Sequence, residues 1–386
     1  MPQNILPEPP EELKQISIAL CEKIRLGIQA QGFIPFSRYM EMVLYEPGLG
    51  YYSAGLHKLG ASGDFTTAPE LGSLFASCLA RQVEEIGEAL GSYDILELGA
   101  GTGRLAADLL TQLPPARQPR RYLILERSAD LGARQQHLIA ERVPGWQDQV
   151  KWLTQPPREP WQGIVLANEV LDALAVERFR LGSNGIEQVC VGSDRTGFDW
   201  RFRPASDELY RAVRRLQLKD VPGFTSELNM HLAPWLQAVT ASLQKGVALL
   251  IDYGYPRSEY YLPERRDGTL MCNYRHRAHA DVFFWPGLQD ITAFVDFTAL
   301  AEAGEGCGLK LAGYTSQAMF LLGCGLDRIL PRRIAESSDE GLKVNAEARQ
   351  LTMPGIMGER FQVMALARGL DMPLRGFALR DLSHRL

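Results

Sequence analysis

Residues 94–110 read DILELGAGTGRLAADLL. An apolar strand, three glycines (Gly99, Gly101 and Gly103) and the start of an amphipathic helix follow one another here. Glycine permits a tight turn and lets the backbone approach a ligand closely. The unpaired N–H groups at the start of a helix bind anionic or polar groups. This strand, loop and helix together predict a nucleotide-type cofactor bound on a Rossmann-like α/β fold.

Two acidic residues lie at the predicted cofactor loop. Glu97 stands two residues before the first glycine, and Glu126 ends the next apolar run, where an acid accepts hydrogen bonds from ribose hydroxyls. Residues 101–106 also satisfy the pattern G-x-G-x-x-A, so the motif alone leaves S-adenosyl-L-methionine (SAM) and a nicotinamide dinucleotide open. The place of Glu97 and two further strands at the end of the chain favour SAM.

Short apolar runs alternate with amphipathic helices on both sides of this stretch. Helices are predicted at 104–113 and 129–143, and strands at 94–98, 121–125, 150–153, 163–168, 246–252, 310–316 and 360–368. The alternation indicates a parallel sheet with helical crossovers. Because the strands are almost continuously apolar, we expect helices on both faces of the sheet.

The domain organisation is expected to have three parts. Residues 1–75 would form an N-terminal helical segment and a cofactor-covering loop, residues 76–370 the core, and residues 371–386 a tail. Insertions at about 178–245 and 253–289 begin near the carboxyl ends of predicted strands, where open α/β sheets bind ligands. Within the first insertion, helices are expected near 206–217 and 226–243.

Composition narrows the classes of partner and compartment. A formal net charge of −5 gives no sign of nucleic-acid binding. Six cysteines lie scattered without CxxC spacing, which favours a reducing compartment. No import signal and no apolar stretch of membrane-spanning length is evident, so the expectation is a cytoplasmic protein without membrane insertion. The sequence does not indicate an oligomeric state, and a homodimer stays open.

Several longer motifs resemble the MidA-type family, whose mitochondrial members are arginine methyltransferases that assist assembly of respiratory complex I. The motifs occur in the family's order and read GDFTTAPE (63–70), LELGAGTG (96–103), NEVLDALAVERF (168–179), IDYGY (251–255), GTLMCNYRHR (268–277), PGLQDITAFVDF (286–297) and GERFQVMALA (358–367). The family usually has proline where this chain has Ala175. The resemblance implies a Rossmann-like, seven-stranded, mostly parallel methyltransferase sheet with a smaller lid, and SAM as the cofactor.

An arginine substrate would require carboxylates at the site. A guanidinium stays protonated and is held best by bidentate carboxylates. Glu169 and Asp172 directly follow the fourth predicted strand and are the predicted catalytic residues, with Glu169 as the main guanidinium ligand. In their spacing, Glu169 and Glu177 also loosely resemble the acidic pair that arginine methyltransferases of another branch place after the equivalent strand. An alternative for Asp172 is to cap the next segment or to pair with Arg178.

Further cofactor contacts are predicted on two segments. The family resemblance assigns Asp64, Thr66 and Thr67 to the covering loop, although Asp64 after a glycine is also typical of a local Asx-turn. Asn168 ends a strand beside the cofactor cleft and could donate to the cofactor. No metal is expected, because the HxxH pair His276 and His279 has no second ligand cluster.

These observations predict a SAM-dependent methyltransferase that modifies arginine on a protein, with a complex I subunit as one candidate substrate. Two other functions stay open: a methyltransferase acting on a small molecule, and a non-catalytic assembly factor that retains the fold. A nicotinamide dehydrogenase is a more distant alternative.

Overall fold

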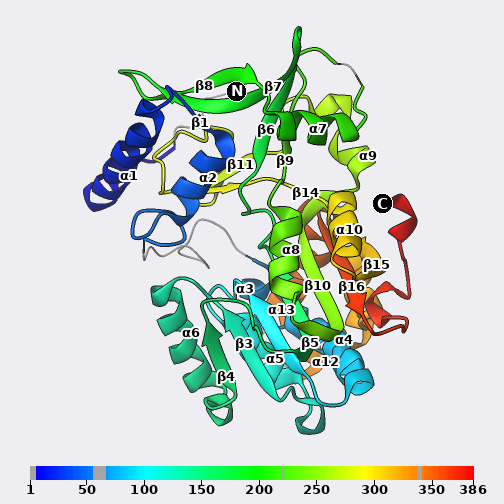
Figure 1. The fold of residues 1–386 in the computed structure, drawn as a ribbon. Helices are drawn as coiled ribbons and strands as arrows, with labels where there is room; N and C mark the ends of the chain where they lie inside the picture. Colours follow the sequence, from blue (N-terminus) through cyan, green and yellow to red (C-terminus); the bar gives the residue numbers. More distant parts are fainter. Residues whose placement is uncertain (1–5, 55–66, 220, 337–340) are drawn as a thin grey trace. The chain divides into compact units, whose positions relative to one another are not determined.

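The computed structural model describes residues 6–54, 67–219, 221–336 and 341–386. The chain separates into two compact units. The first is built from the described parts of 1–65, 172–231 and 258–294, and the second from those of 66–171, 232–257 and 295–386. Figure 1 shows the elements of each unit.

The second unit contains one large sheet. Its strand order is β15-β16-β10-β5-β2-β3-β4, and a short strand β14 (Val295–Asp296) pairs with the end of β10. The strands are β2 (Asp94–Leu98), β3 (Arg121–Leu125), β4 (Val150–Leu153), β5 (Trp161–Asn168), β10 (Leu243–Tyr255), β15 (Lys310–Ser316) and β16 (Phe361–Arg368). The run from β4 to β10 is parallel, whereas β16 is antiparallel to both of its neighbours. The seven expected strands are therefore present, with β14 in addition.

The chain crosses from one side of β2 to the other within this sheet. It passes from β2 to β3 and β4 on one side and then returns to β5 on the opposite side. Such a reversal leaves a crevice at the carboxyl end of β2, which is where open parallel sheets bind ligands. The glycine loop that follows β2 begins at this point.

Helices cover both faces of the large sheet (Figure 1). They are α3 (Ala68–Leu71), α4 (Leu74–Leu90), α5 (Arg104–Gln112), α6 (Ala129–Arg142), α8 (Leu232–Thr240), α10 (Phe297–Gly306), α11 (Gln317–Gly323), α12 (Leu326–Glu336) and α13 (Gly341–Thr352). Ile95 and Val247 pack with α4 and α5 in one buried cluster. On the opposite face, a Cβ added at Gly304 of α10 would lie 2.9 Å from Leu366. Strand side chains on both faces of the sheet are therefore buried, as the apolar runs predicted.

The first unit combines helices with two smaller sheets. It contains α1 (Glu11–Gln29), α2 (Phe36–Tyr45), α7 (Asp207–Arg215) and the sheet strands β1 (Ile34–Pro35), β6 (Glu177–Gly182), β7 (Gly185–Ser193), β8 (Phe198–Pro204) and β9 (Thr225–Leu228). A second sheet has the order β12-β11-β13, from β11 (Met271–Tyr274), β12 (Arg277–His279) and β13 (Asp290–Thr292). Phe36, Tyr39 and Tyr51 are fully buried in the core of this unit.

One helix prediction is wrong in part. Residues 225–228 form β9, which pairs with β6, and the helix begins only at Leu232. Glu227 is buried in this strand and receives the Arg178 side chain at 3.3 Å and the backbone N–H of Thr269 at 2.7 Å. Long-range pairing therefore overrides the local helical pattern.

The histidines of the HxxH motif have structural roles here. Arg275 and His276 have positive φ values of 47° and 59° in the two-residue turn between β11 and β12, as a tight hairpin requires. The Nδ1 atom of His279 accepts the backbone N–H of Asp281 at 3.2 Å. Within the described ranges, no group of three or more metal-ligating side chains comes together. The same residues contain no helix of the length and apolarity that crossing a membrane requires.

Candidate active site

The glycine loop turns sharply between β2 and α5. Gly99, Gly101 and Gly103 have φ values of 62°, 55° and 86°, the left-handed region that favours glycine. A Cβ at Gly99 would lie 3.1 Å from Cγ2 of Val170, in the segment after β5. All three glycines therefore occupy backbone positions that the turn requires, as the motif predicted.

Glu126 follows the last residue of β3 at the same edge of the sheet. The N–H of Gly99 donates to the carbonyl of Leu125 at 3.4 Å, so the glycine loop starts beside this strand end. Each carboxylate oxygen of Glu126 has a partner: the backbone N–H of Ser128 at 2.8 Å and Nε2 of Gln135 at 3.1 Å. The carboxylate is thus held in place beside the loop, where an acid is expected to contact a ribose.

Glu97 lies below the loop within β2. Its side chain is buried and accepts the hydroxyl of Tyr122 at 2.7 Å. Burial raises the pKa of this carboxyl more than the hydrogen bond from Tyr122 lowers it, and the resulting pKa is about 7. A contact between Glu97 and the cofactor stays a prediction.

Asn168 and Glu169 stand at the carboxyl end of β5. Nδ2 of Asn168 donates to Oε1 of Glu169 at 3.0 Å. Oδ1 of Asn168 is buried and accepts no hydrogen bond from any described residue. A buried acceptor of this kind normally has a partner, so its position beside the glycine loop fits a cofactor that donates a hydrogen bond.

The backbone of Glu169 has a left-handed φ of 55°. Its N–H donates to the carbonyl of Ile251 at 2.9 Å. Asp252, fully buried at the end of β10, fixes the next turn, because its Oδ2 accepts the N–H groups of Val170 at 3.1 Å and Leu171 at 2.8 Å. Surrounding hydrogen bonds thus hold a glutamate in a conformation that costs about 1 kcal/mol.

The other acidic candidates lie in different surroundings. Asp172 is buried, counts with the first unit, and accepts the N–H of Ala293 through its carbonyl at 2.9 Å. Glu177 accepts the hydroxyl of Ser37 and Nε2 of Gln188, so the structure gives it partners inside the first unit. Arg178, the alternative partner considered for Asp172, pairs with the buried Glu227.

The expected covering segment is described only from Thr67 onward. Asp64 and Thr66 lie outside the described residues. Thr67 immediately precedes α3, and its carbonyl accepts the N–H of Glu70 at 2.9 Å.

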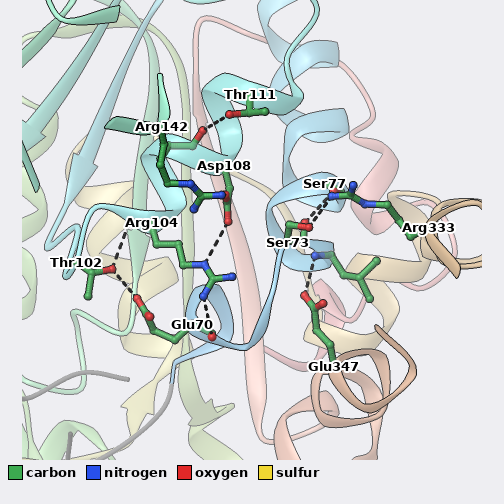
Figure 2. A network of polar contacts seen from close by, with 12 residues as sticks. Glu70, Ser73, Ser77, Thr102, Arg104, Asp108, Thr111, Arg142, Arg333 and Glu347 are labelled. Carbon is green, nitrogen blue, oxygen red and sulfur yellow. Dashed lines mark hydrogen bonds and ion pairs between the residues drawn. The ribbon is translucent and has the colours of Figure 1, made fainter. Parts of the chain in front are cut away.

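A polar network joins α3 to the glycine loop (Figure 2). Oε1 of Glu70 accepts the hydroxyl of Thr102 at 2.5 Å, and Arg104 donates to the Glu70 carbonyl at 3.1 Å. Arg104 also lies 3.5 Å from Asp108, which pairs with Arg142 of α6 at 2.9 Å. α3 is therefore attached to the loop and, through α5, to α6.

Sequence reasoning missed two contacts at this site. Gln135 joins the loop to Glu126, and no feature of its helix distinguishes it from an exposed glutamine. The bond between Glu70 and Thr102 links two motifs of the family, and their shared presence was the only signal available.

Known proteins resemble this chain over most of its length. The model of a family described as "Putative S-adenosyl-L-methionine-dependent methyltransferase" matches residues 74–315. The chain belongs to this family of SAM-dependent methyltransferases. A protein from Burkholderia thailandensis, described as a "likely methyl transferase" and solved bound to S-adenosyl-homocysteine, is 42% identical with a TM-score of 0.94. That match covers 99% of this chain and 100% of the other.

Curated animal relatives are more distant. The mouse protein arginine methyltransferase NDUFAF7, mitochondrial, is 29% identical over 92% of this chain and 86% of its own length. The Drosophila melanogaster homologue is 27% identical over 94% and 90%. These matches confirm the resemblance to the MidA-type family, the methyltransferase fold and SAM as the family's cofactor. The expected cytoplasmic localisation is wrong by the same comparison, because these relatives are named as mitochondrial.

Proposed function

We propose that this SAM-dependent methyltransferase transfers a methyl group to an arginine side chain of a protein. One observation carries the proposal: the glutamate at the carboxyl end of β5 is held at a φ of 55° beside the glycine loop. Strained backbone at such a place supports a functional role, because the strain has no use in folding. The curated relatives are named protein arginine methyltransferases, which supports the same substrate class.

The glycine loop and its neighbours would hold the cofactor. The backbone at Gly99, Gly101 and Gly103 would approach it closely, and Glu126 would accept hydrogen bonds from the ribose. Asn168 would offer its Oδ1, which has no hydrogen-bond partner among the residues that the structure describes. Glu97 would contact the cofactor from β2, and Asp64, Thr66 and Thr67 would contact it from the covering segment. When bound, SAM supplies the methyl group that is transferred.

Glu169 would grip the substrate. A guanidinium is planar and remains charged, so a carboxylate orients it through paired hydrogen bonds and offsets the cost of desolvating it. The amide of Asn168 holds Oε1 of Glu169 at 3.0 Å, which directs the carboxylate. Asp172 would support Glu169. A strong base is unnecessary, because the guanidinium nitrogen loses its proton only as the new N–C bond forms.

The insertions at about 178–245 and 253–289 are the segments we assign to recognition of the protein substrate. A complex I subunit as that substrate is suggested by the family resemblance alone. The comparisons with known proteins do not support a homodimer.

The test is a labelled-methyl transfer assay on lysate from a strain that lacks this protein. Wild-type protein and labelled SAM are expected to place label on arginine of a protein, identified by mass spectrometry. Glu169→Gln is expected to keep SAM affinity within about twofold and to lose methyl transfer at least 100-fold, because it removes the charge that pairs with the guanidinium. Glu305→Gln, an exposed position in α10, serves as the control with normal turnover.

Three results would contradict the proposal. Label on a small molecule would favour the alternative methyltransferase, and no label together with tight SAM binding would favour a non-catalytic assembly factor. Normal turnover by Glu169→Gln would show that Glu169 is not the substrate ligand.

A further inference from the structure

The side chain of Gln135 in α6 connects three separate segments. Its Nε2 donates to the carbonyl of Gly101 at 2.9 Å and to Oε2 of Glu126 at 3.1 Å. Its Oε1 accepts the indole N–H of Trp152 in β4 at 2.9 Å. The residue is 0% exposed, so these hydrogen bonds form away from bulk water.

The chemistry of these three partners suits a primary amide. The carbonyl of Gly101 and the carboxylate of Glu126 only accept hydrogen bonds, and an indole N–H only donates. A primary amide offers two N–H donors and one oxygen acceptor on the same planar group. Because the Trp152 N–H must meet an acceptor, it fixes the orientation of the amide and directs both donors of Gln135 to the loop and to Glu126.

Gln135 also contacts the third glycine of the loop. A Cβ at Gly103 would lie 3.2 Å from Cγ of Gln135, closer than most side-chain contacts. The side chain therefore lies against Gly103 while it binds the carbonyl of Gly101. The two glycines and the carboxylate of Glu126 share one buried neighbour.

We propose that Gln135 is a positioning residue for SAM binding. Its side chain holds the glycine loop and the carboxylate of Glu126 in one preformed arrangement. The inference rests on the cofactor site proposed above. A preformed site binds more tightly, because its groups need no ordering when the ligand arrives. Loss of the amide frees the loop and the carboxylate to move independently, and SAM affinity falls.

The first measurement is the Kd for SAM of three purified proteins by calorimetry. Gln135→Met keeps the length of the side chain and removes both donors, so its Kd is expected to rise at least tenfold. The matched control is Gln82→Met in α4. Gln82 is also 0% exposed, donates to the carboxylate of Glu85 at 2.8 Å and accepts the N–H of Gly376 at 2.9 Å.

The control separates positioning from general stability. Both variants lose buried hydrogen bonds, so both are expected to melt at lower temperature than wild type. Only Gln135→Met is expected to lose SAM affinity, and Gln82→Met should bind within twofold of wild type. Equal losses in the two variants would overturn the inference, because the effect would then follow stability.

A pH series on Gln135→Glu gives a readout that a purely structural role would not produce. Below its pKa the new carboxylic acid carries one O–H donor, which can serve Glu126 or Gly101. Once ionised it offers no donor and repels the carboxylate of Glu126. The measured quantity is the Kd of the variant divided by the Kd of wild type at the same pH. For Gln135→Glu this ratio is expected to rise at least fivefold between pH 5 and pH 8, whereas for Gln135→Met it should stay level. A level ratio for Gln135→Glu would contradict the role.

Glu126→Ala distinguishes failure of this inference from failure of the site. Wild-type affinity in Glu126→Ala would overturn the proposed cofactor site and the role of Gln135 with it. A large loss in Glu126→Ala with near-normal binding by Gln135→Met would overturn the positioning role alone.

Discussion

Glu169 combines an unfavourable backbone conformation with a place at the carboxyl end of β5. A residue with a side chain avoids a φ of 55°, and glycine adopts it without strain. The N–H groups held by Asp252 and the pairing with Ile251 keep the turn in this form. The proposed role of its carboxylate in binding the substrate would account for a glutamate at this strained position.

Glu169→Gly tests this separation of stability from function. The substitution relieves the strain, so we expect the free energy of unfolding in urea to stay level or to rise by about 1 kcal/mol. Methyl transfer should be lost in the same protein. A fall in stability of more than about 1 kcal/mol would mean that the side chain of Glu169 stabilises the fold.

At the scale of elements, α3 is the helix that directly follows Thr67 of the expected covering segment in the chain. The carboxylate of Glu70 binds Thr102 in the glycine loop, and Oε1 of Glu347 in α13 accepts the N–H of Leu74 at 2.7 Å (Figure 2). A Cβ at Gly72 would lie 2.0 Å from the carboxylate of Glu347, so the turn between α3 and α4 has no space for a side chain. α13 and the loop thus hold the turn and α3 from two directions.

We expect Thr102→Val to raise the Kd for SAM about tenfold. Valine matches threonine in shape and removes the donor to Glu70, a charge-assisted hydrogen bond worth roughly 1.5–3 kcal/mol. Thr111→Val in the same helix region removes a bond of 2.8 Å to the carbonyl of Ala107 and serves as the control. If Thr102→Val and Thr111→Val bind SAM with equal affinity, α3 does not position the loop.

Elements and site differ in how far the sequence predicts them. The strands of the large sheet were predictable because each is a buried apolar run, and the glycines because the turn needs positive φ. The strand at 225–228 was not, since it forms by pairing with β6, whose residues lie more than 40 positions earlier in the chain. The contacts of Gln135, and the bond between Glu70 and Thr102, were not predictable for the same reason: the partners are distant in sequence, and neither glutamine nor glutamate is rare on a surface.

Across the whole molecule, Glu97 links stability to pH. Burial raises its pKa to about 7 in the folded protein from an ordinary value of 4.5. Between these values the unfolded chain releases the proton and the folded chain keeps it, so stability falls as pH rises. The contribution is intact below about pH 4.5 and is lost above about pH 7.

We expect Glu97→Gln to remove this part of the pH dependence. The amide oxygen can still accept the hydroxyl of Tyr122, and no charge remains to be buried. At pH 8 the variant should be more stable than wild type by about 3 kcal/mol, because one pKa unit corresponds to ~1.4 kcal/mol. At pH 4.5 the difference should vanish. Urea unfolding at the two pH values measures both, and an equal difference at each would rule out Glu97 as the source.

The proposed function requires that backbone groups at the end of β2 hold SAM. Calorimetric titration with SAM and with NADH tests this most directly, on wild type, Gly101→Val and Gly145→Val. Gly145 has open space around it and serves as the control. We predict that wild type and Gly145→Val bind SAM and do not bind NADH. Gly101→Val should lose SAM binding, because residue 101 has a φ of 55°, which valine avoids, and because the added side chain would fill the space that the cofactor needs. Binding of NADH, or unchanged SAM affinity in Gly101→Val, would contradict a SAM site at the end of β2.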